Sequence, residues 1–353
     1  MEREFVSLES ATATRAGAGG APCQGLYHRP PGAAPKTAFI ASHYNVDFAE
    51  HYLASYLAHR GFGFLGWNTR FRGAEAYFLL EHALVDIGAG VRWLRDEAGV
   101  DTIVLLGNSG GGSLMAAYQS QAAAGELPPA DLYVSLNSHP GRPEVLTAWM
   151  DPSVVDEADP LARDPALDMY DPAHGPPYPP GFVAAYRAAQ HERNERITRW
   201  AGEELERVAA AGVRDRIFAL HRVWADLRFA DLTIDPSDRE AGCYLGDPAR
   251  ANAGPLGIGR VSTLRTWLSM WSLSHSQCRG APHLERLRLP ALVVQSLADR
   301  GVFPSDAHAI HDALGSADKQ LALVPGGHYL RSPEGARDEV ADMIAGWVQE
   351  RVT

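Results

Sequence analysis

Short apolar runs alternate with amphipathic segments along the first 140 residues of the chain. Apolar or alternating runs at residues 5–8, 25–28, 37–41, 62–67, 102–106 and 132–136 predict strands. Residues 49–60 and 79–94 predict helices, and a further helical segment, residues 114–119, follows a cluster of glycines. Strands that alternate with helices predict an α/β fold, in which a mostly parallel twisted sheet has helices on both faces.

This alternation stops between residues 139 and 287. An Asp- and Pro-rich stretch at residues 151–180 precedes a long predicted helix at 182–210, and a loop-rich section at 231–260 precedes a helical segment at 262–276. Strand patterns return at residues 290–295 and 320–324, and an amphipathic helix at 333–352 ends the chain. We therefore expect a core made of residues 1–139 and 286–353, and a mainly helical insertion formed by residues 140–285.

Composition narrows the choice of partners. The chain has 353 residues, of which 46% are hydrophobic and 21% charged, as in an ordinary globular protein. Its net charge of −11 argues against nucleic acid or an anionic membrane surface as the main partner, because both need a basic patch. The sequence has no apolar run long enough to span a membrane and no signal-peptide pattern near Met1. Three scattered cysteines, Cys23, Cys243 and Cys278, favour a reducing cytoplasm.

One glycine-rich turn carries the first chemical signal, Gly107-Asn108-Ser109-Gly110-Gly111. A phosphate-binding loop would require lysine where Ser113 stands, and a dinucleotide-binding loop would require glycine in place of Ser109. The pattern G-x-S-x-G between a strand and a helix instead predicts a sharp, strained turn that exposes the serine for attack. The helix that follows adds positive potential beneath it.

A serine nucleophile needs a base, and the base needs an acid that orients it. His328 follows the predicted strand at 320–324, and Asp299 follows the one at 290–295, so both lie where an open parallel sheet places its site. Two other acids, Asp306 and Asp312, fall in a predicted helix. His308 and His311 in the same segment are interpreted as solvated side chains and not as metal ligands, since no third ligand accompanies them. We expect neither a metal nor another cofactor.

These motifs together resemble the α/β-hydrolase superfamily, over residues 1–140 and 285–353. The resemblance implies that Ser109 is the nucleophile, His328 the general acid and base, and Asp299 its orienting partner. It also implies that the insertion at 140–285 is a cap over the active site. The backbone N–H groups of Gly110 and Tyr44 would form the oxyanion hole, although the family usually has His-Gly where this chain has His43-Tyr44.

Six further residues are candidates for substrate binding, and most of them have a structural alternative: His43, Asn108, Arg70, His139, Trp267 and Trp271. His43 is expected to hold its own loop. Arg70 could clamp a substrate carboxylate or form an ion pair with Asp86. The two tryptophans are four residues apart, as core residues on one helix face would be. Five of the eight tryptophans lie in the insertion, which suggests an apolar wall over the site.

The sequence therefore predicts a cytoplasmic serine hydrolase that cleaves an ester or lactone of a medium-sized hydrophobic or aromatic substrate through an acyl-enzyme. Hydrolysis of a C–C bond in a diketone, thioester hydrolysis and acyl transfer stay open, because they use the same triad. A non-catalytic ligand receptor on the same fold is a second hypothesis. We expect a small-molecule substrate and no nucleic-acid or membrane partner, and a homo-oligomer is possible.

Overall fold

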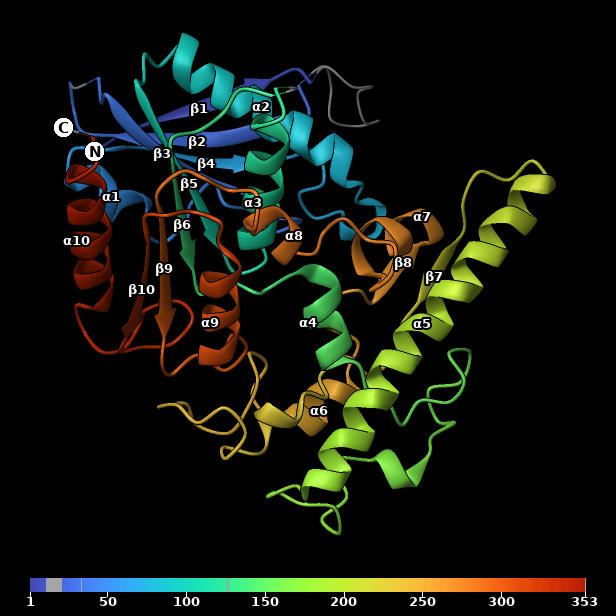
Figure 1. Ribbon diagram of the computed structural model, residues 1–353. Coiled ribbons are helices and arrows are strands. Elements are labelled where there is room, and N and C mark those ends of the chain that lie inside the picture. The colour runs from blue at the N-terminus through green and yellow to red at the C-terminus, as the bar shows by residue number, and fades with distance from the viewer. Residues whose placement is uncertain (11–20, 33, 126, 353) are drawn as a thin grey trace.

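The fold is built around one large mixed β-sheet (Figure 1). The computed structural model describes residues 1–10, 21–32, 34–125 and 127–352. The eight strands of the sheet lie in the order β1-β2-β4-β3-β5-β6-β9-β10. Neighbours from β4 to β10 run parallel, whereas β2 is antiparallel to both β1 and β4. The strands are β1 (Glu2–Leu8), β2 (Cys23–Arg29), β3 (Thr37–Ala41), β4 (Gly63–Asn68), β5 (Thr102–Asn108), β6 (Leu132–Leu136), β9 (Ala291–Ser296) and β10 (Lys319–Val324).

The burial of each strand explains its sequence pattern. Every residue of β6 and β9, and every residue of β5 except Thr102, is buried, as expected for parallel strands covered on both faces. The edge strand β1 exposes most of its residues instead. Each of the eight runs that the sequence predicts to be strands is a strand of this sheet.

Helices cover both faces of this sheet. On one face lie α1 (Ala54–His59) and α10 (Ala336–Gln349), which pack through a cluster that includes Phe64, Val104 and Ile344. On the other face lie α2 (Leu80–Asp96), α3 (Gly111–Ala122) and α9 (Pro304–Ala313) (Figure 1). The structure thus has the layers that the sequence predicts. No helix in the described part of the chain is both long and apolar enough to cross a membrane.

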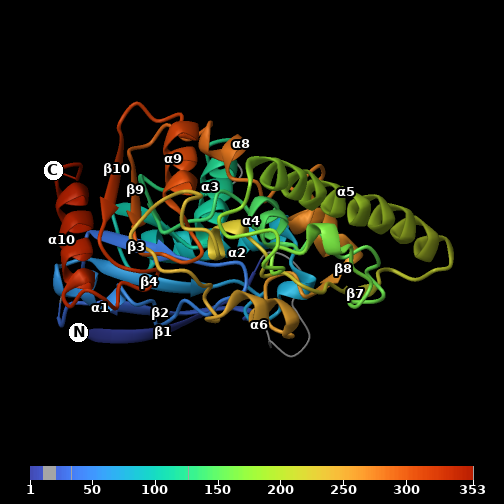
Figure 2. The ribbon, with the colours of Figure 1, turned by 90° about the horizontal axis from the view of Figure 1, so that it is seen from below.

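The segment between β6 and β9 is mainly irregular and helical (Figure 2). It contains α4 (Arg142–Trp149), the 31-residue α5 (Pro180–Ala210), the short antiparallel pair β7 (Ile217–Ala219) and β8 (Val261–Thr263), α6 (Pro248–Ala253), α7 (Leu264–Thr266) and α8 (Ala281–Leu284). One apolar cluster joins Leu146 and Trp267 of the insertion to Leu114 and Met115 of α3. The insertion therefore shares a core with the sheet. Its division from the core at residues 139/140 and 285/286 stays a prediction.

The helix expected over residues 262–276 is only partly present, and this prediction is corrected. The segment starts in β8, continues as one turn in α7 and ends as a wide, π-type turn, η4 (Trp267–Trp271). Pairing with β7 holds the first residues extended, and the hydroxyl of Thr263 then caps the turn by accepting from Thr266 N at 3.1 Å. Beyond the turn, Leu273 N donates to Asn194 Oδ1 in α5 at 3.0 Å. In a longer helix this N–H group would instead donate to a backbone carbonyl one turn earlier.

Candidate active site

Ser109 lies on a strained turn between β5 and α3. Its φ of 57° is unfavourable for a residue with a side chain. Its N–H group donates to the carbonyl oxygens of Leu136 and Asn137 at 3.2 and 3.1 Å, which fixes the turn against the end of β6. A Cβ atom at Gly107 would lie 2.5 Å from Gly112 Cα, so the strand and helix can approach this closely only with glycine there. The turn has the features that the G-x-S-x-G pattern predicts.

Asp299 and His328 form a buried pair beyond the ends of β9 and β10. Asp299 Oδ2 lies 2.7 Å from His328 Nδ1, and both side chains are almost completely buried. Asp299 Oδ1 also accepts from the N–H groups of Gly301 and Val302, at 2.9 and 3.1 Å. The carboxylate is therefore held in place, and a proton on His328 Nδ1 would leave Nε2 free to act as a base.

The Ser109 turn and the His328 loop are joined through Asn137. Asn137 accepts the Ser109 N–H through its carbonyl, and its side-chain amide donates to the His328 carbonyl at 3.1 Å. Within the described ranges, no hydrogen bond joins the Ser109 hydroxyl to His328 or to another side chain. Catalytic hydrogen bonds are often long in a free enzyme and shorten when substrate binds. The serine–histidine contact of the triad therefore stays a prediction.

The insertion adds a residue that sequence reasoning missed, Tyr244. Its hydroxyl lies 3.0 Å from Asp299 Oδ1 and 2.9 Å from His328 Nδ1, and its ring centroid lies 4.8 Å from that of His328. Burial and the nearby Asp299 carboxylate hold the pKa of the phenol well above its usual value, so it stays protonated and donates to Asp299. No motif marks Tyr244, because its partners lie 55 and 84 residues further along the chain.

The oxyanion hole that the sequence predicts consists of two backbone N–H groups. Neither Gly110 N nor Tyr44 N donates to any residue that the structure describes, although both residues are buried. Gly110 precedes the first turn of α3, so the positive end of that helix faces the same place. The Tyr44 phenol points elsewhere, to Ser113 Oγ at 3.0 Å. The arrangement fits the predicted roles of Gly110 and Tyr44.

Two further histidines are buried near His328. His43 Nδ1 accepts from the N–H groups of Asn45 and Val46 at 3.3 and 3.2 Å, so this histidine holds its loop, as expected. His139 donates its backbone N–H to the Ser109 carbonyl at 3.1 Å, and its ring packs edge-on against Trp149. Burial, together with the charges of Arg142 and His328, holds the pKa of both imidazoles well below the usual value. Both are therefore neutral at pH 7.

Two other substrate-binding candidates take part in structural contacts. Asn108 donates to the Leu136 carbonyl at 2.8 Å and lies 3.2 Å from His51 Nε2, so it braces the turn from beneath. Arg70 binds Asp86 through two nitrogens, at 2.6 and 2.8 Å, with both side chains buried. The structure thus contains the Arg70–Asp86 ion pair, which is the structural alternative to a role of Arg70 in binding a substrate carboxylate.

The two candidate tryptophans differ in their surroundings. Trp267 is fully buried in the apolar cluster that joins the insertion to α3, and it donates its indole N–H to Thr198 in α5 at 3.0 Å. Trp271 is also fully buried, and the guanidinium of Arg142 lies 4.5 Å from the centroid of its ring. Arg142 Nη1 would lie 3.0 Å from a Cβ atom at Gly110, so this arginine connects Trp271 to the Ser109 turn.

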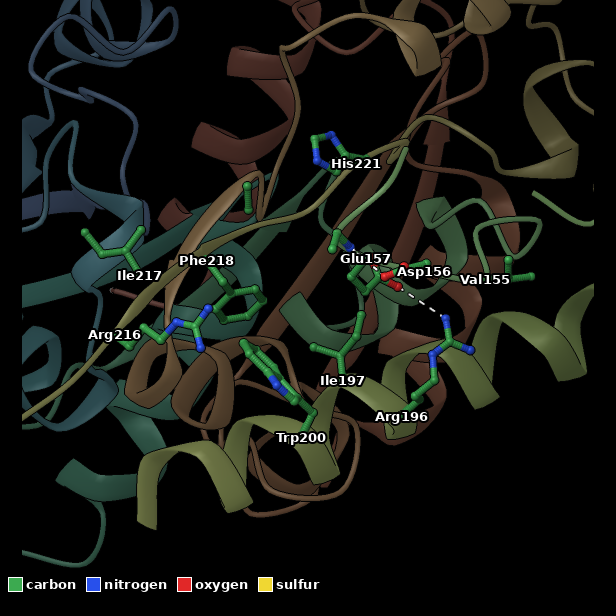
Figure 3. A pocket seen from close by; sticks show the side chains of 12 residues that line it. Val155, Asp156, Glu157, Arg196, Ile197, Trp200, Arg216, Ile217, Phe218 and His221 are labelled. Carbon is green, nitrogen blue, oxygen red and sulfur yellow. Dashed lines mark hydrogen bonds and ion pairs between the residues drawn. The ribbon is translucent and has the colours of Figure 1, made fainter. Parts of the chain in front are cut away.

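A pocket of about 560 Å³ lies within the insertion, apart from these residues (Figure 3). Trp200, Ile197 and Phe218 supply apolar surface, and an ion pair of 3.2 Å between Arg196 and Glu157 lies beside them (Figure 3). None of the residues discussed around Ser109 lines this pocket. In the part of the chain that is described, no three His, Cys, Asp or Glu side chains are grouped so that they could hold a metal ion.

Comparison with known proteins identifies the fold. No protein-family model and no curated protein matches the sequence. Among solved structures, the α/β hydrolase GrgF from Penicillium sp. sh18 is 11% identical with a TM-score of 0.54, covering 99% of this chain and 97% of that one. The esterase domain from a Rhodothermus marinus protein is 15% identical with a TM-score of 0.50, covering 99% of both chains. The structure of DcsB in complex with its substrate analogue is 13% identical with a TM-score of 0.57, covering 100% of both chains.

Proposed function

We propose that this chain, which has the α/β-hydrolase fold, is a serine hydrolase of carboxylic esters or lactones. One observation carries the proposal: the buried Asp299–His328 pair of 2.7 Å lies in loops that Asn137 joins to the strained Ser109 turn. The available N–H groups of Gly110 and Tyr44 support the same chemistry, because acyl transfer needs donors for a developing oxyanion. The esterase domain among the similar structures agrees with it.

The proposed reaction proceeds in two steps. His328 Nε2 removes the proton of Ser109 as the hydroxyl oxygen attacks the ester carbonyl, and Asp299 stabilises the imidazolium. The tetrahedral oxyanion accepts from Gly110 N and Tyr44 N, and His328 returns its proton to the departing alkoxide. In the second step His328 deprotonates water, whose oxygen attacks the carbonyl carbon of the acyl-enzyme. The bond between that carbon and Ser109 Oγ then breaks, His328 returns the proton to Oγ, and the carboxylic acid is released.

The surroundings of His328 support an apolar or aromatic substrate of medium size. Tyr244 packs on His328, and Trp149 lies 6.1 Å from Tyr244, 5.6 Å from His139 and 4.6 Å from Trp224, measured between ring centroids. Large aromatic side chains of this kind supply stiff apolar surface with few polar atoms. We propose that the insertion acts as a cap that presents this surface to the substrate. Thioester, diketone and acyl-transfer reactions would use the same residues.

We also propose that the protein works in a reducing compartment such as the cytoplasm. Cys23, Cys243 and Cys278 are all buried and unpaired in the structure. Burial raises the pKa of the Cys278 thiol to about 12, which keeps it protonated and unreactive at neutral pH. Free thiols of this kind are typical of proteins that carry no disulfide framework.

Hydrolysis of p-nitrophenyl butyrate tests the proposed function. We expect a burst of nitrophenol equal to the enzyme concentration, followed by slower turnover. Ser109→Ala and His328→Gln should each lose at least about a thousandfold in kcat/KM while melting at a temperature near that of the wild type. Ser274→Ala, in an exposed loop, is the matched control and should keep full activity. Turnover retained by Ser109→Ala would refute the nucleophile, and a wild type that releases no nitrophenol would favour the ligand receptor.

A further inference from the structure

Arg142 at the start of α4 is a buried cation with unused hydrogen-bonding capacity. Only 3% of its side chain is exposed, and its Nη2 donates to Glu75 Oε1 at 2.5 Å. Its Nε is buried without a partner, and its Nη1 donates to no residue among those described. The guanidinium lies 5.0 Å from the Tyr44 ring centroid and 4.5 Å from that of Trp271, so two aromatic rings fix its position.

The free side of this guanidinium faces the nucleophile turn. A Cβ atom at Gly110 would lie 3.0 Å from Arg142 Nη1 and 2.8 Å from His43 Nε2. Since His43 Nδ1 accepts two backbone N–H groups, the proton of this neutral imidazole is on Nε2. Two side-chain N–H donors therefore converge beside Ser109, and the missing side chain of Gly110 leaves room for them.

Two carboxylates near these donors, those of Glu75 and Asp299, already have hydrogen-bond partners. Glu75 Oε2 accepts from Gly259 N at 3.0 Å while its Oε1 binds Arg142, and Asp299 binds His328 and Tyr244. An incoming anionic oxygen would supply the acceptor that Arg142 Nη1 lacks, and a charge-assisted hydrogen bond of this kind is strong in a buried site.

We propose that Arg142 Nη1 and His43 Nε2 bind a carboxylate of the substrate, so that the preferred esters or lactones carry an acidic group close to the scissile carbonyl. The inference rests on the proposed hydrolase activity. The tetrahedral oxyanion is the other anionic oxygen that could lie nearby. We favour the substrate carboxylate because the N–H groups of Gly110 and Tyr44 are the proposed donors for the oxyanion. Arg142 adds a permanent charge, and its Nη1 together with His43 Nε2 can donate to the two oxygens of one carboxylate.

The substrate preference of the wild type gives the first test. The kcat/KM values of monomethyl succinate and monomethyl glutarate are compared with those of methyl pentanoate and methyl hexanoate, by following methanol release. We expect the anionic esters to be favoured at least tenfold, mainly through a lower KM. Equal or better hydrolysis of the neutral esters would overturn the inference but leave the proposed function intact. If neither ester class is hydrolysed, the proposed function itself fails.

Substitution of Arg142 gives the second test. In Arg142→Gln the ratio of kcat/KM between anionic and neutral esters should fall about 10- to 100-fold, the range for a lost charge-assisted hydrogen bond. Arg142→Lys should keep part of that ratio, and Arg163→Gln, an arginine of the insertion in a partly exposed ion pair, should keep all of it. An equal loss for both ester classes in Arg142→Gln would assign the arginine to the oxyanion instead. If the unpaired Glu75 prevents folding, the double variant Glu75→Gln/Arg142→Gln removes both charges and the same ratio is measured.

Discussion

At the scale of single residues, the most informative contact is the one between Tyr244 and the Asp299–His328 pair. The phenol donates to Asp299 Oδ1 at 3.0 Å, on the oxygen that His328 does not use. It also packs on the imidazole ring, so it limits the rotation of His328. Tyr244 is thus a positioning residue that connects the insertion to the predicted catalytic pair.

We predict that Tyr244→Phe lowers kcat about tenfold and changes KM less than threefold. The ring still packs, but Asp299 loses one donor, and one hydrogen bond to a charged group is worth about 1.5–3 kcal/mol. Steady-state kinetics on p-nitrophenyl butyrate measure both constants. Tyr329→Phe is the matched control, because Tyr329 also packs on His328 but its hydroxyl is not bonded to any described residue. An equal loss of kcat in both variants would contradict a role for the Tyr244 hydroxyl.

Local sequence patterns predicted the roles of some residues of the candidate site but not of others. Ser109 and His328 stand in glycine-rich turns directly after β5 and β10, so a short stretch of sequence shows each residue together with the strand and turn that position it. Arg142 and Tyr244 have no such signal. Their roles depend on Gly110, Glu75 and Asp299, which distant segments bring close only when the chain folds.

At the scale of secondary-structure elements, a buried ion pair ties the loop after β4 to helix α2. Arg70 and Asp86 are 5% and 0% exposed, and Asp86 also accepts the backbone N–H of Arg70 at 3.0 Å. A buried charge left without its partner is costly, whereas an exposed pair is worth little. The contact therefore serves the packing of α2 on the sheet.

We predict that Arg70→Met lowers the free energy of unfolding by about 3–5 kcal/mol, because it leaves the Asp86 carboxylate buried and unpaired. Urea unfolding followed by circular dichroism measures this change. The matched control is Arg72→Met, which breaks a half-exposed pair with Asp47 and should cost less than about 1 kcal/mol. If Arg70→Met is as stable as Arg72→Met, and KM for the anionic esters rises instead, the carboxylate clamp would be the better reading of Arg70.

Helices and strands could be predicted from the spacing of apolar residues where burial against the sheet alone determines the secondary structure. The strands of the sheet are apolar or alternate because helices cover both faces, and helix α2 shows its buried stripe directly. The segment at 262–276 has an equally helical pattern, yet contacts with β7 and with Asn194 in α5 interrupt it. Those partners lie more than 40 residues away in the sequence, so the local spacing of apolar residues carries no information about them.

At the scale of the whole molecule, the buried histidines make stability depend on pH. Burial lowers the pKa of His51 to about 4, whereas an unfolded histidine titrates near 6.5. Burial acts in the same direction on four others, His28, His43, His139 and His283. Between these pH values the unfolded chain binds more protons than the folded one, so stability rises with pH and is lost on acidification.

We predict that the urea midpoint is highest above pH 7 and falls steadily between pH 6.5 and 5. One pKa unit corresponds to about 1.4 kcal/mol, so His51 contributes at most about 3 kcal/mol to this loss. Urea titrations at pH 7.5, 6 and 5 measure it. In His51→Gln the midpoint should depend less steeply on pH, whatever its absolute value. A wild-type midpoint that stays constant or rises on acidification would show that the buried histidines do not control the pH dependence of stability.

Mass spectrometry of the intact protein and its peptides, after reaction with a fluorophosphonate, tests directly whether Ser109 is a nucleophile. The proposed hydrolase requires that the fold bring Ser109, His328 and Asp299 together so that the serine hydroxyl becomes nucleophilic. We predict one phosphonyl adduct per chain, on Ser109, with none in Ser109→Ala and much slower labelling in His328→Gln. An unlabelled wild type, or an adduct on another serine, would contradict it.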